Sequence, residues 1–421
     1  MPIIAPDSQL RWTMPPESGG ISPPCPPTHK AGILRIVRIL ICLCLFSNLT
    51  SLCAADEILD AGRTTTIDYM LERAISQGLI EGGVVLVGNR DGVLFTTSRG
   101  RAGFSPDAPA LTERTMFDIA SLTKVIATAP AIMKLLEQGR ISLLDPLTRW
   151  FPEFEGTDRE DITILNLLTH TSGLNDISFT GVDPLKTAIH KISIQRSGRV
   201  PGISFHYADI NFILLAELVR RASGLPLDTY CRENFYAPLG MTDTMFLPPH
   251  ERSGSIAATI GATSEPLTGV VQDGNARLLG GVAGHAGLFS SALDLSRFAT
   301  MILNNGELHG VTVFNERVIS QMTAPYFYSN GNVVRGLGWD IYSPYSSPRG
   351  SSFSEWSFGH TGYSGSSIWI DPQSDLFVIL LTVRLNYHDI HHINQLRSDV
   401  STIASSVFSP ARYATVIRKN M

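Results

Sequence analysis

Ser121 and Lys124 form the only Ser-x-x-Lys in the chain, within the segment Phe-Asp-Ile-Ala-Ser-Leu-Thr-Lys at 117–124. A serine hydroxyl becomes a good nucleophile only when a neighbouring base takes its proton, and the start of a helix offers free backbone N–H groups to a developing oxyanion. The i to i+3 spacing places both side chains on one helix face. The pair therefore predicts an activated serine; the alternative is that Ser121 caps a surface helix.

A second polar pair precedes a predicted helix at 209–223. Tyr207 and Asp209 stand two positions apart, directly before an apolar helical pattern. A phenol and a carboxylate at the head of a helix can both point into one cleft and take part in proton transfer. The alternative is structural: Tyr207 packs in the core and Asp209 is the helix N-cap.

A third polar segment, residues 358–365, runs straight into a predicted strand. It reads Phe-Gly-His-Thr-Gly-Tyr-Ser-Gly and contains His360, Thr361, Gly362 and Tyr363. Glycines and polar residues in a strand that is otherwise apolar let the backbone of a ligand approach closely. The alternative is a bulged edge strand without a ligand.

The elements that must position these residues are framed by two hairpins. The first covers residues 83–97 and turns at Asp91-Gly92, and the second covers 367–383 and turns at 371–375. An Asp-Gly pair between β-rich runs is a strong hairpin signal. We therefore predict a mixed α+β fold: one antiparallel sheet assembled from both ends of the chain, flanked by helices, with a mainly helical region inserted between the hairpins.

Helical periodicity appears before the first hairpin and in the inserted region. Apolar residues of the segment 64–79 recur at the spacing of one helix face. Further helices are predicted at 121–138, closing at Gly139, and at 163–169, 209–223 and 291–304, and another follows the last strand.

The composition is that of an ordinary globular protein. Of the 421 residues, 43% are hydrophobic and 17% are charged, which leaves room for a sizeable core. The formal net charge is -5. A chain without a basic surface is not expected to bind nucleic acid.

The first 55 residues do not resemble the rest. Residues 1–29 are rich in proline and polar residues, which predicts a disordered extension or a start codon placed too early. Residues 30–55 combine basic residues, a short apolar run and Ala54-Ala55, the pattern of a secretory signal peptide. The catalytic domain would then cover residues 56–421. Left uncleaved, the apolar run would anchor the protein or associate transiently with a membrane.

Cysteine usage fits an exported protein. Cleavage near Ala55 would leave Cys231 alone of the five cysteines, so no internal disulfide could form. A lone cysteine is usually a buried apolar side chain. An exported enzyme that needs no disulfide suits a bacterial periplasm, so we predict a periplasmic or secreted location.

The three polar segments, in this order, resemble the penicillin-recognising serine hydrolases, whose pattern is Ser-x-x-Lys, Tyr-x-Asn and Lys-Thr-Gly or His-Thr-Gly. This family contains class C β-lactamases, low-molecular-weight penicillin-binding proteins and related esterases. The resemblance covers nearly all of residues 60–405 and is nearest to the branch of class C β-lactamases and penicillin-binding protein 4B. Two further segments add to it, Leu-Leu-Thr-His-Thr-Ser-Gly-Leu at 167–174 and Gly-Gly-Val-Ala-Gly-His-Ala-Gly-Leu-Phe-Ser-Ser at 280–291.

The resemblance implies a β-lactamase/transpeptidase-like fold, no metal and no cofactor. It also implies a role for each candidate residue. Ser121 would attack a carbonyl and become acylated, with Lys124 and Tyr207 moving the protons. The backbone N–H groups of Ser121 and Tyr363 would form the oxyanion hole. The residues expected to contact the substrate are Asp209, His360, Thr361 and Gly362.

Two residues depart from the family pattern. Asp209 stands where asparagine is usual, and a carboxylate there favours the charged form of Lys124, which makes that lysine a poorer base. His360 stands where a charged lysine is common. An imidazole is mostly neutral at neutral pH, so its attraction for a substrate carboxylate is weaker.

Other catalytic sites are not supported by the sequence. It contains no Gly-x-Ser-x-Gly, no His-Glu-x-x-His and no phosphate loop. The cluster His-Asp-x-His-His at 388–392 is more typical of a helix-start loop than of a zinc site. His170 and His285 are expected to hold loops by hydrogen bonds.

The leading hypothesis is an exported serine hydrolase that acts through an acyl-enzyme. Its substrate would be a peptidoglycan peptide ending in D-alanyl-D-alanine, or a small molecule that is a related amide or ester. The alternatives are an esterase for small acyl esters, which needs no carboxylate anchor and so tolerates His360 better, and a catalytically silent binder of cell-wall peptides. The sequence does not predict an oligomeric state.

Overall fold

The computed structural model describes residues 62, 64–196, 198–329 and 333–409. Residue contacts divide the chain at Leu59 and Asp60, and every described residue belongs to the second unit. The extension predicted at 1–29 and the signal peptide predicted at 30–55 lie outside the described residues. No helix in the part that the structure describes is both long and apolar enough to cross a membrane.

The second unit is built on one antiparallel sheet whose strand order is β10-β11-β12-β13-β14-β15-β1-β2. β1 and β15 pair along their length, from Gly82 opposite Val383 to Gly88 opposite Phe377. The prediction of a sheet assembled from both ends is therefore confirmed, as are both hairpins. The strands are β1 (Ile80–Asn89), β2 (Gly92–Gly100), β10 (Phe327–Ser329), β11 (Val333–Arg335), β12 (Asp340–Tyr342), β13 (Phe358–Thr361), β14 (Ser367–Asp371) and β15 (Leu376–Arg384).

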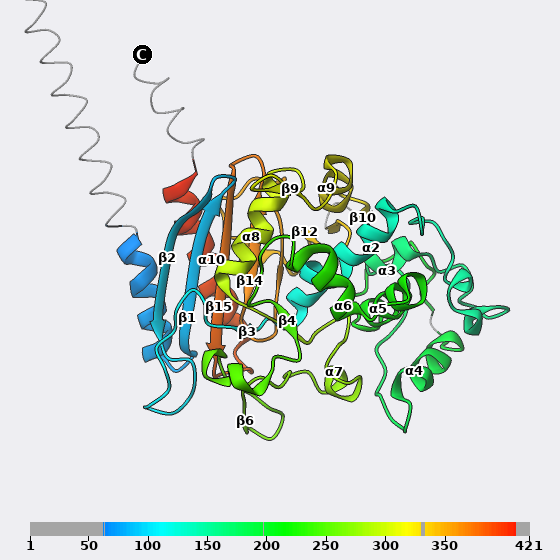
Figure 1. The fold of residues 1–421 in the computed structure, drawn as a ribbon, viewed down its shortest axis with the longest axis horizontal. Coiled ribbons are helices and arrows are strands. Elements are labelled where there is room, and N and C mark those ends of the chain that lie inside the picture. The colour runs from blue at the N-terminus through cyan, green and yellow to red at the C-terminus, as the bar shows by residue number, and fades with distance from the viewer. Residues whose placement is uncertain (1–61, 63, 197, 330–332, 410–421) are drawn as a thin grey trace, which may run out of the picture. The chain divides into compact units, whose positions relative to one another are not determined.

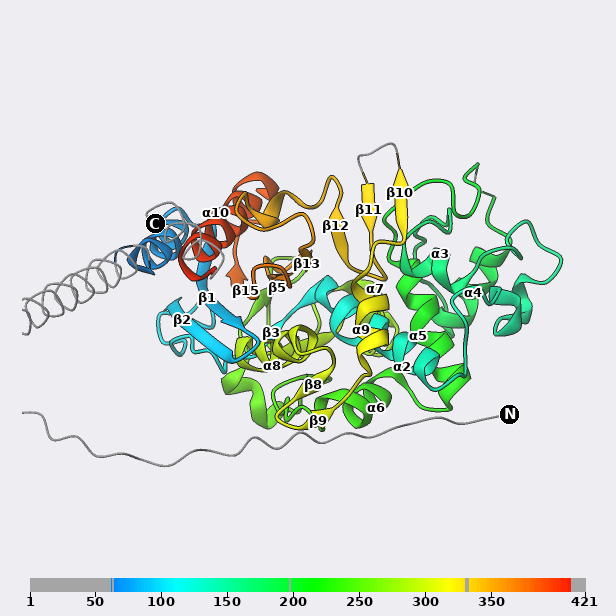
Figure 2. The same ribbon diagram turned by 90° about the horizontal axis from the view of Figure 1, so that it is seen from above.

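Helices cover both faces of this sheet, and several form a separate layer beside it (Figures 1 and 2). The first helix covers residues 64–76. The α-helices that follow are α2 (Ala129–Glu137), α3 (Ile164–Leu168), α4 (Pro184–Ser193), α5 (Ile210–Ser223), α6 (Leu227–Cys231), α7 (Gly274–Leu278), α8 (Ala292–Leu303), α9 (Glu316–Thr323) and α10 (Ile390–Phe408).

Short strands complete the inserted region. β3 (Phe117–Asp118), β7 (Leu288–Ser290) and β4 (Met245–Phe246) form a small sheet in the order β3-β7-β4. Two more pairs are β5 (Thr259–Ile260) with β6 (Pro266–Leu267), and β8 (Glu307–Leu308) with β9 (Val311–Thr312).

The alternation of side chains along β1 divides the core into two layers. Val85 and Val87 pack with the first helix and α10 on one face, whereas Val84 and Leu86 belong to the large cluster that joins the sheet to the inserted helices. β15 is buried along all nine residues, because both faces of the sheet are covered. Each buried Val, Leu or Ile contributes about 1.5–3 kcal/mol to folding.

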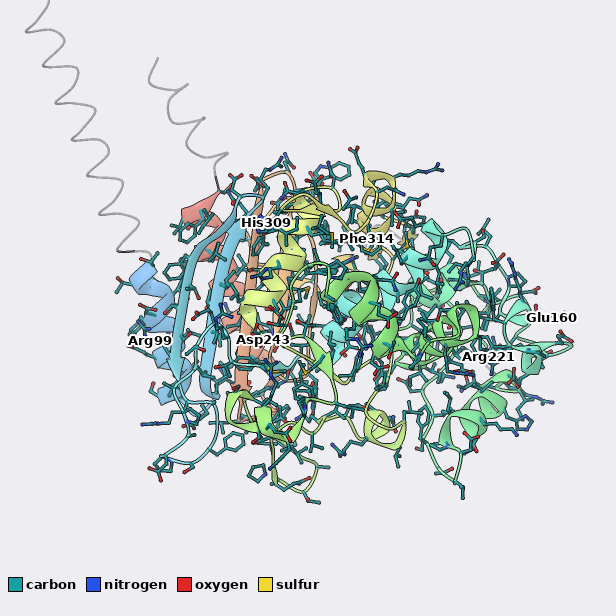
Figure 3. All side chains as sticks on the ribbon, in the orientation of Figure 1. Arg99, Glu160, Arg221, Asp243, His309 and Phe314 are labelled. Atoms are coloured by element: carbon teal, nitrogen blue, oxygen red, sulfur yellow. The ribbon has the colours of Figure 1, made fainter. Side chains whose placement is uncertain are left out.

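The predicted helices differ from the observed ones mainly at their ends. The first helix was expected to reach residue 79 but ends at 76, because Gly78 adopts a φ of 66° and the chain turns there. The last turn of α5 is held by Arg221, which contacts Glu217 (2.7 Å) and Glu153 (3.1 Å). In Figure 3, Arg221 lies in the helical layer and Arg99 lies at β2, at the opposite end of the unit.

Candidate active site

The candidate nucleophile follows a strained turn at the end of β3. Ala120 has a φ of 48°, a conformation that costs a residue with a side chain about 1–2 kcal/mol. Two hydrogen bonds hold it: Asp118 Oδ1 accepts from Ala120 N (2.9 Å), and Thr123 Oγ1 donates to Ala120 O (2.7 Å). The turn places Ser121 at the head of the helix, half-buried in a cavity wall.

The helix predicted at 121–138 begins irregularly. A 3-10 turn at Ala120–Leu122 is followed by a π-helical turn at Lys124–Thr128 and then by α2. Residues 122–133 are buried, and Ser121 lies inside the 3-10 turn, whose N-cap residue is Ile119. The alternative of a serine that caps a surface helix is therefore wrong.

Lys124 is fully buried and donates to three acceptors. Its Nζ lies 3.0 Å from Ser121 Oγ, 2.7 Å from Asp209 Oδ1 and 3.2 Å from the carbonyl oxygen of His285. An ammonium has three N–H donors and no acceptor. The three contacts therefore use every donor of a charged lysine.

The charges of Lys124 and Asp209 stabilise each other. Burial acts to lower the pKa of Lys124, but Asp209 and Tyr207 outweigh it and raise the pKa above its ordinary value. Burial likewise acts to raise the pKa of Asp209, and the charge of Lys124 holds that pKa below its ordinary value. At neutral pH the pair is an ion pair, so Lys124 is not a free base in the resting site.

Asp209 does not cap α5, contrary to the structural alternative. It is the residue before the helix, but its side chain makes no cap hydrogen bond and turns to Lys124 instead. The N–H of Ile210 is satisfied by Asp176 Oδ1 (2.9 Å). A distant aspartate thus frees Asp209 for the site.

Tyr207 lies between Lys124 and a group of aromatic rings. Lys124 Nζ is 5.0 Å from the centroid of its ring. The ring stacks on His170 at 4.4 Å and lies 5.5 Å from Tyr345 and 6.1 Å from His360. These contacts leave little freedom to the phenol beside Lys124.

β13 brings the His-Thr-Gly segment to the same place. A Cβ added to Gly362 would lie 2.6 Å from the carbonyl oxygen of Ile119, so only glycine allows the strand to approach the nucleophile turn this closely. His360 is buried, and its Nδ1 contacts Thr361 O at 2.8 Å. Burial, with the nearby charges of Lys124 and Arg335, lowers the pKa of His360 well below its ordinary value, which leaves the imidazole uncharged at neutral pH.

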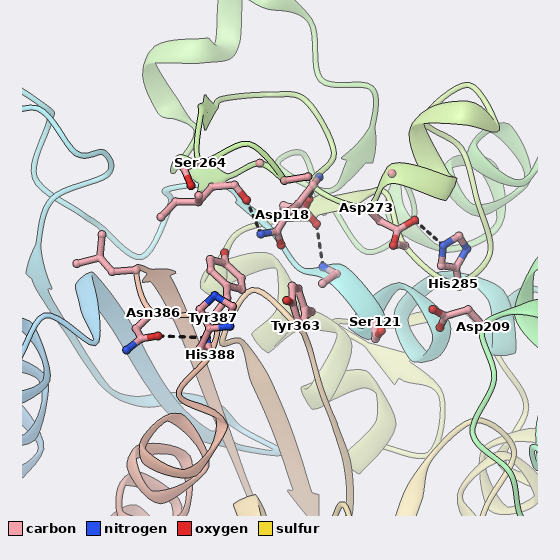
Figure 4. A pocket seen from close by; sticks show the side chains of 18 of the residues that line it. Asp118, Ser121, Asp209, Ser264, Asp273, His285, Tyr363, Asn386, Tyr387 and His388 are labelled. Carbon is pink, nitrogen blue, oxygen red and sulfur yellow. Dashed lines mark hydrogen bonds and ion pairs between the residues drawn. The ribbon is translucent and has the colours of Figure 1, made fainter. Parts of the chain in front are cut away.

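Two cavities meet at the nucleophile, and Ser121, Tyr207 and Tyr363 line both. The larger, about 820 Å³, is also lined by Asp118, Asp209 and Asp273 (Figure 4). The smaller, about 230 Å³, contains three arginines: Arg335, Arg384 and Arg397. The site therefore has an acidic side and a basic side.

Sequence reasoning missed these arginines, because none belongs to a local motif. Arg335 is paired with Asp340 at 2.9 Å. Arg397 donates to the carbonyls of Gly365 (3.0 Å) and Ser366 (3.1 Å), and it has no carboxylate partner among the described residues. Burial lowers the pKa of Arg397 to about 9, so it is still charged at neutral pH.

The histidine cluster at 388–392 begins α10, as predicted. Asp389 accepts from His392 N (3.0 Å) and contacts His392 Nδ1 (2.7 Å). Within the described ranges, no group of three or more His, Cys, Asp or Glu side chains is arranged to hold a metal ion. Cys231 is buried and free.

Comparisons with known proteins identify the family of the chain. The model of the Beta-lactamase family matches residues 67–399. An N-acetylmuramyl-L-alanine amidase of Bacillus subtilis (strain 168) is 30% identical over 369 residues, which cover 75% of this chain and 80% of the relative. A putative D-alanyl-D-alanine carboxypeptidase of Escherichia coli (strain K12) is 30% identical over 304 residues, which cover 64% and 69%.

Solved structures share the fold. EstCE1, a hydrolase with promiscuous acyltransferase activity, superposes with a TM-score of 0.68 at 20% identity, over 82% of this chain and 100% of that one. A class C beta lactamase superposes with a TM-score of 0.68 at 19% identity, over 82% and 98%.

Proposed function

The chain belongs to the Beta-lactamase family of serine hydrolases, and we propose that it hydrolyses an amide of a cell-wall peptide through an acyl-enzyme on Ser121. One observation carries the proposal: Lys124 Nζ lies 3.0 Å from Ser121 Oγ in the wall of a cavity of about 820 Å³. The relatives described above include a cell-wall amidase and a putative D-alanyl-D-alanine carboxypeptidase.

In the first half-reaction, Ser121 Oγ attacks the substrate carbonyl and its proton leaves through Tyr207. The reactive form is the one in which the coupled Lys124 and Tyr207 have together lost one proton to solvent; Lys124 then holds Oγ, and the pair takes the proton of Ser121 through Tyr207. The N–H groups of Ser121 and Tyr363 would stabilise the oxyanion, each by about 3 kcal/mol. Tyr207 then protonates the leaving amine as the C–N bond breaks.

In the second half-reaction, water attacks the ester carbonyl of acylated Ser121. Tyr207 takes a proton from the water, the C–O bond to Ser121 breaks, and the proton returns to Oγ. The products are a carboxylic acid and the free enzyme, so the cycle is balanced without a cofactor.

The basic cavity supports a substrate whose leaving group carries a carboxylate. His360 is uncharged and cannot attract that group, but Arg384 and Arg397 line the same cavity as Ser121 and Thr361. Most of their N–H groups donate to backbone carbonyls, among them Tyr363 O (2.8 Å) and Gly365 O (3.0 Å), so the two guanidinium groups would attract a carboxylate by their charge. A terminal D-alanine is one such leaving group.

An esterase for small acyl esters is the second candidate, favoured by the uncharged His360. Ester hydrolysis needs no carboxylate anchor, and the catalytic steps at Ser121 would be the same. A silent binder of cell-wall peptides is less consistent with the site, since binding alone does not require a buried lysine beside a serine.

We further propose that residues 56–421 form the catalytic domain and that residues 30–55 direct export to the periplasm or the medium. Cell-wall relatives support that location. Transient association with a membrane through the leader would follow if cleavage is incomplete.

The test uses purified residues 56–421 and the Ser121→Ala variant. We expect slow turnover of a peptide ending in D-alanyl-D-alanine, weaker turnover of the same peptide with an amidated C-terminus, and a Ser121-dependent mass adduct with a fluorescent penicillin. Fast turnover of a short-chain p-nitrophenyl ester without preference for the free carboxylate would favour the esterase. Turnover that survives Ser121→Ala would overturn both.

A further inference from the structure

The segment at 284–288, part of a motif to which the sequence assigned no chemistry, runs alongside the nucleophile helix. Four hydrogen bonds attach it: Thr128 Oγ1 to Gly284 O (2.7 Å), Lys124 Nζ to His285 O (3.2 Å), Leu288 N to Thr123 Oγ1 (3.2 Å) and Ile119 N to Leu288 O (3.1 Å). The segment is also wedged against α5, because a Cβ added to Gly284 would lie 2.0 Å from Phe212 O. These contacts fix the two ends of the segment, at Gly284 and Leu288, and the only one of the four that involves residue 285 is the contact with Lys124.

The ring of His285 is held by one partner. Its Nε2 contacts Asp273 Oδ1 at 2.9 Å, and the side chain is only 1% exposed. Its Nδ1 is buried and has no hydrogen-bond partner among the described residues. Figure 4 shows the contact between Asp273 and His285 on the side of the cavity where Asp209 lies. Among the described residues, the contact with Asp273 is thus the one hydrogen bond that orients the ring.

Asp273 is itself fixed. It caps α7 by accepting from Ala276 N (2.7 Å). Burial acts to raise its pKa, but the hydrogen bond and charge of His285 outweigh burial and lower the pKa to about 2. Asp273 is thus a charged anchor with a defined place at the start of a helix.

We propose that Asp273 and His285 are a positioning pair for Lys124. Asp273 fixes the imidazole, the imidazole fixes the backbone of residue 285, and the carbonyl of that residue takes one of the three N–H groups of the Lys124 ammonium. Without Asp273, the ammonium of Lys124 would still donate to Asp209 but would lose the carbonyl of residue 285 as an acceptor. Nζ would then move relative to Ser121 Oγ. The proposal rests on the roles assigned above to Ser121 and Lys124.

This role differs from that of the other titratable groups around Lys124. Asp209 supplies charge, and Tyr207 supplies a proton acceptor. His170 and His360 are both buried, and burial lowers the pKa of each well below its ordinary value. The Asp273 and His285 pair supplies geometry, so its loss should lower kcat and leave KM nearly unchanged.

The first experiment compares His285→Ala with His285→Gln, whose amide can still donate to Asp273. Misplacing a reacting group by about 1 Å costs about a hundredfold in rate. We expect His285→Ala to lose kcat on that scale, to keep KM and to change the pH profile of kcat. We expect His285→Gln to recover most of the loss. The matched control is His392→Ala, which removes the histidine of the exposed pair with Asp389 (2.7 Å) and should behave as the native enzyme.

The second experiment is a double-mutant cycle of Asp273→Ala and His285→Ala. Two residues that act as one unit give a double variant no slower than either single variant. If Asp273→Ala acted only by removing the N-cap of α7, it would lower the melting temperature, and the kcat losses of the two single variants would not overlap in the double variant.

Native kcat and pH profile in a folded His285→Ala, failure of His285→Gln to recover activity, or multiplicative losses in the cycle would each overturn the proposal. Ser121→Ala, measured beside these variants, distinguishes a failure of the positioning pair from a failure of the proposed function. If Ser121→Ala is inactive and His285→Ala is unimpaired, only the positioning pair is wrong. If Ser121→Ala keeps its turnover, the proposed function itself is wrong.

Discussion

The imidazole of His170 stacks on the phenol ring of Tyr207, with centroids 4.4 Å apart and planes 25° apart. Nδ1 of His170 accepts from Ala208 N (3.3 Å) and contacts the amide nitrogen of Asn211 (3.1 Å). An Nδ1 that accepts carries no proton, so the ring is neutral, in agreement with burial lowering its pKa. The Thr-His-Thr motif thus holds a loop, as predicted, and also forms the platform on which Tyr207 rests.

The stack predicts the effect of His170→Asn. The backbone of His170 has a φ of 56°, which asparagine tolerates better than alanine does, so this variant removes the ring with little added strain. Stacked aromatic pairs contribute about 0.5–1.5 kcal/mol, which corresponds to a loss of about two- to tenfold in kcat when the phenol is less well placed. Steady-state kinetics with a p-nitrophenyl ester measures it. Unchanged kcat in His170→Asn would show that the platform is not needed.

Gly362→Ala should remove nearly all activity. The added Cβ would meet Ile119 O at 2.6 Å, a distance that real side chains do not adopt, so either β13 or the nucleophile turn must shift. A shift of about 1 Å at this place costs about a hundredfold in rate. The control is Gly254→Ala, where an added Cβ meets nothing within 4 Å. Equal activity of the two variants would contradict the close approach of strand and turn.

Local patterns in the sequence predicted which residues at the ends of helices and strands belong to the site. The resemblance to the family predicted that these residues lie close together in the fold. Ser121 with Lys124, and His360 with Gly362, are short motifs beside strong helix or strand signals. The partners that complete the site carry no such signal. Arg397 lies in the middle of α10. In the sequence Asp273 is recognisable only as a helix cap, and its contact with His285 is visible only in the folded structure. Tertiary contacts of this kind leave no periodicity in the sequence.

The irregular start of the nucleophile helix was also beyond the sequence. Helical periodicity predicted one helix from residue 121, but the first turns are 3-10 and π-helical. The carbonyl of Ile126 accepts from Tyr236 OH (3.1 Å), more than a hundred residues away. Partners this far away leave no signal in the local sequence, and π-helical turns are frequent at functional sites.

Asp209→Asn should lower the pKa of Lys124, because Asp209 is the main group that raises it. The pH at which kcat/KM reaches half its maximum should then be lower, because the coupled Lys124 and Tyr207 lose one proton at a lower pH when the charge of Asp209 is gone. A pH profile between 5 and 10, fitted for both enzymes, measures the shift. A shift to higher pH would contradict the assignment.

Asp209→Asn also tests how much the ion pair of Asp209 and Lys124 contributes to the free energy of unfolding. The pKa of Asp209 lies below its ordinary 3.8 and that of Lys124 above its ordinary 10.5. The pair therefore stabilises the fold between these values, and this contribution is lost as the pH falls below the first or rises above the second. At pH 7 we expect Asp209→Asn to cost about 1–2 kcal/mol by urea unfolding, less than a fully buried pair, because the Asp209 side chain is 34% exposed. A cost that is the same at pH 3 and pH 7 would show that charge is not its source.

Asp118 predicts the opposite dependence on pH. Burial raises the pKa of this carboxyl from 3.8 to about 6, although Gln272 N and Ala120 N donate to it. A carboxyl whose pKa is raised on folding contributes stability that is fully present below pH 3.8 and is lost as the pH rises through about 6. The loss is about 3 kcal/mol, since each unit of pKa corresponds to about 1.4 kcal/mol.

Asp118→Asn removes this dependence, because the amide does not titrate. One hydrogen bond is lost at every pH, since Asn has one acceptor oxygen for the two backbone donors. The difference in unfolding free energy between variant and native protein should therefore change in favour of the variant by about 3 kcal/mol between pH 4 and pH 7. Urea unfolding at several pH values measures this difference. A difference that stays constant over this range would mean that the two backbone donors keep the carboxylate ionised in spite of its burial, and that the nucleophile turn is held by a charge at all of these pH values.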